Sequence, residues 1–395
     1  MNKVINKLQA YLFIALGVFI PTSIAVTNLI IGLISLCWIL DGNLKVKLQL
    51  IKESKWILAI FALITLYALG MLWGSTHLNA SWQFQRLALL LMFPVLATIN
   101  IDQDTIKKSA VAFLITTFIS ALLAISININ IISPLSEYVS VINNHWANSA
   151  FIRYNYHNVL LSLSFALALY LIIKGRTKYR NMLILFIIGY AISIFTEMGR
   201  AGQVIFNLTI VFYIIYYVRK SILKSLAIFL LLISFQLLVY NSSDNTYKRR
   251  IDTASKIIKN NGDRGVGAPQ DIRYVFVRES LNRIFLKPIL GHGTGSFGTI
   301  FKDNVNSGHD FNKHTTPHNQ YLYVWFELGI LGLLFLLMIF YYQIRELLRK
   351  HDGIHRISLP VSFLFLMLVD SYLFIFTLTI AYIYLYTIYS RYESE

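Results

Sequence analysis

Apolar residues occur along this chain in long runs, and short polar segments separate the runs. A helix needs about 20 consecutive apolar residues to cross the hydrocarbon core of a bilayer. The pattern predicts twelve such helices, at 9–22, 24–41, 56–74, 86–99, 109–131, 158–173, 182–197, 202–218, 225–240, 320–342, 357–370 and 372–389. The sequence therefore predicts an all-α, polytopic integral membrane protein.

The composition agrees with this class. Of the 395 residues, 56% are hydrophobic and only 14% are charged, whereas soluble proteins have about a quarter of their residues charged. The single cysteine, Cys37, lies within a predicted span. It excludes an internal disulfide and a cysteine-based metal cluster.

The positive charges predict the topology. A net charge of +16 can indicate nucleic-acid binding, but in a membrane protein the side on which the cations lie is decisive. With the N-terminus inside, 20 Lys and Arg residues fall in cytoplasmic segments, and the short outer loops hold only Arg86, Arg153 and Arg200. Another 12 lie in segment 241–318, a long loop of the kind that is exempt from the charge bias. We expect both termini in the cytoplasm and no nucleic-acid partner.

The same layout predicts three parts along the chain. Residues 1–240 form a transmembrane bundle of about nine spans, 241–319 form an outer loop domain with short helices, and 320–395 form the C-terminal spans. Long loops are usually functional, and seven of the nine histidines fall on the outer side. We therefore expect any chemistry outside the cytoplasm.

One motif stands directly before an apolar run: PHNQYLYVWFELGILG, residues 317–332. Thr316 suits the cap of a helix and Pro317 its first residue, which would place His318 and Asn319 in the first turn. The helix dipole there attracts anions and disfavours imidazolium, so that His318 would stay neutral and basic. Gly329 and Gly332 would let another helix approach closely. The alternative is a capping turn without chemistry.

Three stretches of the chain resemble the O-antigen ligase and O-antigen polymerase superfamily. His318-Asn319, nine residues and then Gly329-x-x-Gly332 is similar to its signature. The segment RYVFVRESLNRIFLKPILGHGTGSFG, 273–298, resembles its preceding block, and TEMGRAG, 196–202, resembles its arginine-bearing turn. Val277 departs from the family, which often has tryptophan there.

The resemblance implies a reaction. A glycan built on undecaprenyl pyrophosphate is transferred to a sugar hydroxyl of lipid A core, at the periplasmic face of the bacterial inner membrane and among its lipids. It implies that neither a metal ion nor a nucleotide cofactor is needed.

The chemistry assigns roles to particular residues. Transfer needs a base for the acceptor hydroxyl, and His318 is the candidate. It also needs cations for the departing pyrophosphate, and arginine binds phosphate oxygens bidentately. Arg200 and Arg273 are the catalytic candidates, with weaker substrate-binding candidates at Asn319, Arg250 and Arg153.

Other residues have plainer interpretations. Arg200 alternatively snorkels or pairs with Glu197, one turn earlier. Arg278 and Arg283 favour surface or lipid-headgroup contacts, and for Glu327 we expect a structural hydrogen bond. GTGSFG, 293–298, fits a nucleotide-binding pattern but follows no strand. Asp102-Gln103-Asp104 resembles a metal-binding pattern but falls in a cytoplasmic loop.

The sequence favours an O-antigen ligase and leaves three alternatives open. A polymerase uses the same donor with a lipid-linked glycan as acceptor, and a protein O-oligosaccharyltransferase uses a protein. A polysaccharide flippase would be a transporter, for which paired discontinuous helices or an inverted repeat are typical. The sequence shows neither.

The predicted topology can be tested by cysteine labelling at Asn260 and Glu395. A membrane-impermeant reagent applied to intact cells should label position 260 and leave position 395 unlabelled, because only short cytoplasmic loops carry the cation excess. Labelling of the C-terminus from outside, or protection of position 260, would contradict the topology.

Overall fold

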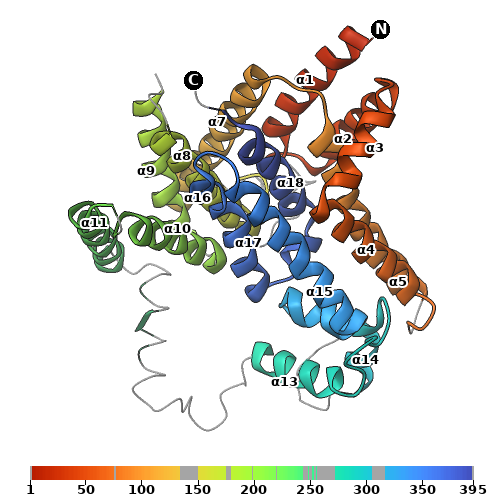
Figure 1. Ribbon diagram of the computed structural model, residues 1–395. Coiled ribbons are helices and arrows are strands. Elements are labelled where there is room, and N and C mark those ends of the chain that lie inside the picture. Colours follow the sequence, from red (N-terminus) through yellow and green to blue (C-terminus); the bar gives the residue numbers. More distant parts are fainter. Residues whose placement is uncertain are drawn as a thin grey trace. The chain divides into compact units, whose positions relative to one another are not determined.

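The computed structural model describes residues 2–74, 77–133, 150–174, 179–197, 199–218, 220–242, 248, 251–252, 255, 272–304 and 316–393. Every regular element among them is a helix (Figure 1). The elements are α1 (Asn2–Phe19), α2 (Ile24–Leu40), α3 (Leu44–Glu53), α4 (Lys55–Gly70), α5 (His77–Ala88), η1 (Leu89–Leu91), α6 (Met92–Thr98), α7 (Gln103–Asn128), α8 (Tyr154–Lys174), α9 (Arg180–Thr196), α10 (Arg200–Val218), α11 (Ile222–Asn241), α13 (Ile272–Ile284), α14 (Ser296–Asn304), α15 (Gln320–Leu348), α16 (Gly353–Arg356), α17 (Ser358–Val369), η4 (Tyr372–Phe374) and α18 (Phe376–Arg391).

The all-α prediction is confirmed, and each predicted apolar segment coincides with one helix or with consecutive short ones. The number of spans differs. Within the described residues, five helices are long and apolar enough to cross a membrane, namely α7, α8, α10, α11 and α15. A sixth candidate is α2 with α3, which are bent by 109°. Shorter apolar helices such as α4, with 16 residues, are only about 24 Å long, less than the roughly 30 Å of a bilayer core, and so are not among these candidates.

The helices group into two compact units. Unit 1 comprises Met1–Phe13, Asn28–Thr105 and Pro269–Arg391, and unit 2 comprises Ile14–Thr27, Ile106–Ala268 and Tyr392–Glu395. His318 therefore lies in unit 1, and Arg153 and Arg200 lie in unit 2. The three-part division expected along the chain concerns sidedness and stays a prediction.

The core of unit 1 forms around α18. Its tyrosines are almost completely buried, and Tyr382 illustrates the packing. The Tyr382 ring lies 5.7 Å from Phe93 of α6, 5.7 Å from Phe340 of α15 and 4.3 Å from Phe363 of α17. Its hydroxyl donates to Gln343 Oε1 at 2.5 Å. A segment with the hydropathy of a membrane span thus forms the centre of this unit.

The core of unit 2 forms around α8, which packs against α9 and α10 (Figure 1). In its most apolar window, 78% of α8 is buried, whereas only 6% of α11 is buried. Phe165 of α8 packs against Phe206 of α10 with ring centroids 4.5 Å apart. These contacts make α8 the support on which the turn between α9 and α10 rests.

Helix α15 is not continuous, because its backbone breaks at Gly329. This residue has φ 66° and ψ −166°, far from helical values. A Cβ at this position would lie 2.0 Å from the carbonyl oxygen of Ile289. The sequence led us to expect another helix at this glycine, and that was wrong: the neighbour is the backbone of the loop that follows α13.

This loop, residues 288–293, supplies the hydrogen bonds that the break removes. Three backbone hydrogen bonds join loop and helix: from His292 N to Phe326 O (2.9 Å), from Gly293 N to Glu327 O (2.8 Å) and from Ile330 N to Pro288 O (2.8 Å). An unpaired backbone group costs several kcal/mol inside a membrane, on the order of 4. The loop and the broken helix therefore stabilise each other.

Replacing Gly329 by alanine should strongly destabilise the protein. The Cβ would meet the Ile289 carbonyl, and the backbone would be held at a positive φ that alanine disfavours. We expect a loss of roughly 2 kcal/mol or more in the free energy of unfolding. Thermal unfolding of the purified protein in detergent measures it.

Gly32→Ala is the matched control. Gly32 is helical and has open space around its Cβ position, so alanine there should be neutral or slightly stabilising. Equal melting temperatures for the two variants would contradict the proposed role of the break.

Candidate functional site

His318 lies two residues before α15 begins. Asn319 is the N-cap residue: its side-chain Oδ1 accepts a hydrogen bond from Leu322 N at 3.0 Å, and the helix begins at Gln320. The prediction that Thr316 caps the helix and Pro317 starts it was therefore wrong. Asparagine is as good a cap as threonine, and the proline is displaced from the first turn.

The backbone of His318 is left-handed, with φ 52°. Few residues other than glycine adopt this conformation, and it places the imidazole beside Asp370, directly after α17. His318 Nδ1 lies 3.1 Å from Asp370 Oδ1, and both side chains are partly exposed, at 29% and 21%. Such backbone conformations are common at functional sites because the surrounding structure must enforce them.

Two contacts hold this pair in place. Asp370 Oδ1 also accepts a hydrogen bond from Ser371 N at 2.7 Å. The Asn319 amide donates through Nδ2 to Leu368 O at 3.2 Å, which ties the start of α15 to the end of α17. Asn319 is therefore engaged within the protein through both its oxygen and its nitrogen. The substrate-binding role expected for it stays a prediction.

The geometry fits a histidine that acts as a base. A carboxylate only accepts hydrogen bonds, so Asp370 favours the tautomer with the proton on His318 Nδ1 and the basic lone pair on Nε2. The carboxylate would also stabilise the imidazolium formed when Nε2 takes a proton. The Phe276 ring lies 5.7 Å from the imidazole and forms an apolar side of the site.

The glycine-rich stretch GTGSFG does not form a phosphate-binding loop. Its first three backbone N–H groups are used within the protein: Gly293 donates to Glu327 O, Thr294 to Gly70 O and Gly295 to the Glu327 side-chain Oε1. No N–H of these three remains for a phosphate. The last contact is the structural hydrogen bond expected for Glu327, at 3.0 Å.

His292, in the same loop, also has a structural role. Its ring stacks on Phe326 with centroids 4.7 Å apart, and Nε2 lies 3.0 Å from Arg283 O. Partial burial, with Lys287 and Arg283 nearby, lowers the pKa of His292 below its ordinary value. The neutral ring donates to the carbonyl and supports the loop.

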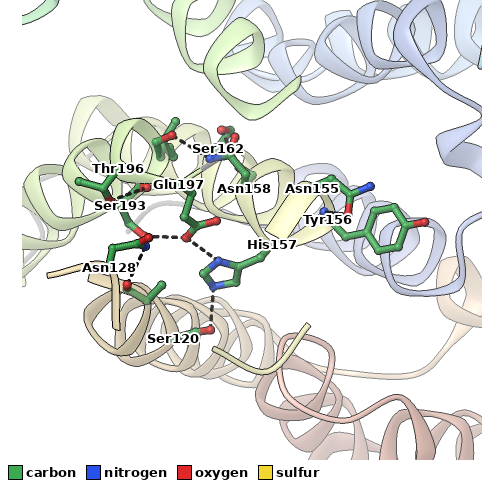
Figure 2. A network of polar contacts seen from close by, with 12 residues as sticks. Ser120, Asn128, Asn155, Tyr156, His157, Asn158, Ser162, Ser193, Thr196 and Glu197 are labelled. Atoms are coloured by element: carbon green, nitrogen blue, oxygen red, sulfur yellow. Dashed lines mark hydrogen bonds and ion pairs between the residues drawn. The ribbon is translucent and has the colours of Figure 1, made fainter. Parts of the chain in front are cut away.

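Arg200 is the first residue of α10, and its side chain is exposed. No hydrogen bond or ion pair joins it to another residue in the described part of the chain. The alternative interpretation paired it with Glu197, and that was wrong. Figure 2 shows Glu197 pointing instead to His157 of α8, with His157 Nδ1 2.7 Å from Glu197 Oε1. The guanidinium is thus not neutralised by its nearest acid.

The other predicted arginines are placed as follows. Arg153 is exposed directly before α8. Arg250 lies outside the described residues, and so does the side chain of Arg273, whose backbone belongs to α13. Arg278 and Arg283 both pair with Glu279 at 3.1 Å on that helix; the Arg278 side chain is 48% exposed, in agreement with a surface role, whereas that of Arg283 is only 12% exposed.

Some of the predicted site residues contact one another, whereas others belong to a different compact unit. His318, Asn319 and Asp370 meet in unit 1, whereas Arg153 and Arg200 belong to unit 2. Sequence analysis missed Asp370 as a partner of His318. The signal was present, because an acid between two apolar runs is a functional candidate in a membrane protein.

Asp102 of the D-x-D pattern has a structural role: its side chain caps α7 by accepting a hydrogen bond from Thr105 N at 2.8 Å.

Comparison with known families identifies the central part of the chain. Residues 183–337 match the O-antigen ligase family. The match covers 155 of the 395 residues, and over this part the chain is similar to the family. No curated protein matches the chain. The matched part of the chain extends from α9 into α15 and contains Arg200, Arg273 and His318, whereas Arg153 and Asp370 lie outside it.

Asp370→Asn should slow any reaction in which His318 acts as the base. The amide keeps the shape of the carboxylate but lacks the charge that stabilises imidazolium. We expect a roughly 10- to 100-fold loss in kcat, smaller than the 10²–10⁴ for loss of a general base. Turnover of the purified protein measures it.

Asp352→Asn is the matched control. Asp352 pairs with His351 at 2.9 Å, but His351 is 94% exposed and near the far end of α15. This variant should keep normal turnover. Unchanged kcat in Asp370→Asn, or an equal loss in both, would contradict a role for Asp370 beside the base.

Proposed function

We propose that this protein is an O-antigen ligase. It transfers a glycan from undecaprenyl pyrophosphate to a sugar hydroxyl of lipid A core, at the periplasmic face of the bacterial inner membrane. One observation carries the proposal: His318, in the family-matched region, lies against Asp370 at the start of α15. A histidine oriented by a carboxylate is the group that this transfer needs.

The reaction balances with His318 as the only proton acceptor. The acceptor hydroxyl oxygen attacks the anomeric carbon of the donor sugar, and His318 Nε2 takes the hydroxyl proton as the new glycosidic bond forms. The bond from the anomeric carbon to the pyrophosphate oxygen breaks, and undecaprenyl pyrophosphate leaves with the electron pair. Asp370 stabilises the resulting imidazolium through Nδ1.

Arginines carry the charge of the leaving group. Arg200 supports this role because it is exposed and its nearest acid is engaged elsewhere. Its planar guanidinium can bind two phosphate oxygens at once and always stays charged. We assign Arg273 the same task because of its place in the family-matched region, and Arg250 and Arg153 a weaker part in binding the donor.

Contacts in unit 1 support the proposed sidedness. Residues expected in the cytoplasm lie together, since Trp56 Nε1 donates to Glu346 Oε2 at 2.7 Å and Gln103 Nε2 donates to Arg391 O at 2.7 Å. On the opposite side, Tyr323 OH donates to Gln83 Oε1 at 2.9 Å. His318 lies at the same end of α15 as Tyr323, which is the end that a periplasmic acceptor would approach. We propose that the reaction needs no metal ion or nucleotide.

Transport is less well supported. The break in α15 is a discontinuous helix of the kind that transporters use to bind ions. Here the broken backbone groups at Phe326, Glu327 and Ile330 are bonded to the loop that follows α13. They are therefore not available to a transported ion.

Lipopolysaccharide from a deletion strain tests the function. Loss of a ligase should leave bare lipid A core, with polymer remaining on its lipid carrier. A core that carries a single repeat would show that the protein is a polymerase instead. Normal lipopolysaccharide in the deletion strain would contradict both activities.

Complementation with His318→Ala tests the proposed base. This variant should match the deletion strain, because the loss of a general base costs roughly 10²–10⁴ in rate. His351→Ala, at an exposed histidine, should restore wild-type lipopolysaccharide. Near-normal turnover by His318→Ala would mean that residues 317–319 are only a capping turn.

A second measurement tests metal independence: turnover of the purified protein should persist in excess EDTA.

A further inference from the structure

The chain contains a second histidine-asparagine pair, His157-Asn158, which lies near the start of α8 and is completely buried. Both ring nitrogens of His157 have partners (Figure 2). Nδ1 lies 2.7 Å from Glu197 Oε1, and Nε2 lies 2.8 Å from Ser120 Oγ of α7. A ring without access to solvent and with both nitrogens engaged cannot serve as a base for a substrate, so this pair has another task.

His157 holds the part of the α9–α10 turn that precedes Arg200, through its contact with Glu197. Glu197, three residues before Arg200, accepts hydrogen bonds on Oε1 from His157 and from Ser193 Oγ at 2.9 Å. Glu197 is completely buried, and its Oε2 has no hydrogen-bond partner among the described residues. A buried, half-satisfied carboxylate is costly, so its presence is explained better by the position it enforces than by stability.

Asn158 holds the same turn directly. Its Nδ2 donates to Ile194 O at 2.8 Å, near the end of α9. Two glycines of the turn pack on it: a Cβ at Gly199 would lie 2.3 Å from Asn158 Cβ, and one at Gly202 would lie 1.9 Å from Asn158 Oδ1. The backbone on both sides of Arg200 therefore rests on Asn158 with no room for a side chain.

Arg200 itself contributes nothing to this packing. Its side chain is exposed, while its neighbours Gly199 and Ala201 are buried. A guanidinium on a flexible stem binds phosphate well only if its backbone is fixed, because each freely rotating bond must be ordered on binding. The turn fixes the start of α10 and leaves the arginine side chain to the ligand.

We propose that His157 and Asn158 are positioning residues for Arg200. His157 acts through Glu197, and Asn158 acts through Ile194, Gly199 and Gly202. This inference rests on the proposed function, in which Arg200 binds the donor pyrophosphate. Loss of the His157–Glu197 contact should weaken donor binding and leave the chemical step at His318 unchanged.

Two substitutions at His157 separate this role from general packing. In His157→Asn, the new amide nitrogen would lie where Nδ1 is now, and so would keep the contact to Glu197. In His157→Gln, the amide nitrogen would lie near the position of Nε2, and so would keep only the contact to Ser120. We expect His157→Gln to raise the KM for the lipid-pyrophosphate-linked glycan about 10- to 100-fold, as for the loss of a charged hydrogen bond. His157→Asn should stay near wild type, and kcat should change little in either variant.

A double-mutant cycle with Arg200→Ala completes the test. If His157 acts by positioning Arg200, His157→Gln should raise the donor KM no further once the arginine is absent. Tyr190→Phe is the matched control, because it removes two buried hydrogen bonds between α7 and α9, at 2.8 Å to Thr117 Oγ1 and at 2.7 Å to Leu114 O, away from the turn. It should leave the donor KM unchanged. Melting temperatures verify that all variants are folded.

The outcomes are distinct. Equal effects of His157→Asn and His157→Gln, or additive effects with Arg200→Ala, would overturn the positioning role while leaving the proposed function intact. An unchanged donor KM in Arg200→Ala would overturn the positioning role together with the assignment of Arg200 to the pyrophosphate, whereas the proposed function itself is tested by His318→Ala and the deletion strain. Should His157→Gln not accumulate in the membrane, Asn158→Ala takes its place in the cycle, because it removes the contact to Ile194 O.

Discussion

The backbone break at Gly329 is the constraint on which the candidate site of unit 1 depends. Inside a bilayer each backbone N–H and C=O must find a partner within the protein. The loop at residues 288–293 provides those partners, and glycines allow the two backbones to come into contact. Glu327 reinforces the junction by accepting from Gly295 N. The short helix before the break is thereby fixed, and with it Asn319, the cap that stands next to His318.

The two histidine-asparagine pairs show how one dipeptide serves opposite tasks. His318 is partly exposed, has a left-handed backbone and lies beside the carboxylate of Asp370, which suits a group that must gain and lose a proton. His157 is buried and has both ring nitrogens engaged, which suits a fixed support. In each pair the asparagine bonds to backbone: Asn319 to Leu322 and Leu368, and Asn158 to Ile194. Burial and not sequence separates the two roles.

Much of the fold was predictable, for a simple physical reason. Apolar runs of 14 to 23 residues in a chain with few charges are long enough for helices buried in protein or lipid, so the helices at the twelve segments follow from hydropathy. Their lengths were less predictable. Hydropathy windows do not recognise where a helix ends, bends or breaks, as at Gly329 or between α2 and α3. The burial of α18 among other helices was also beyond hydropathy, since lipid and protein interior are equally apolar.

The sequence by itself determined the class of protein, the family resemblance and the candidate residues His318, Arg200 and Arg273, because these depend on composition and on residues close together along the chain. Only the tertiary structure decided which side chains meet. Asp370 lies 52 residues from His318, and Glu197 lies 40 from His157. Arg200 stands three residues from Glu197, a spacing that favours a pair on a helix, yet the chain leaves the helix at that turn and the acid points to α8. Local spacing predicts contacts only within one regular element, whereas long-range packing selects the partner.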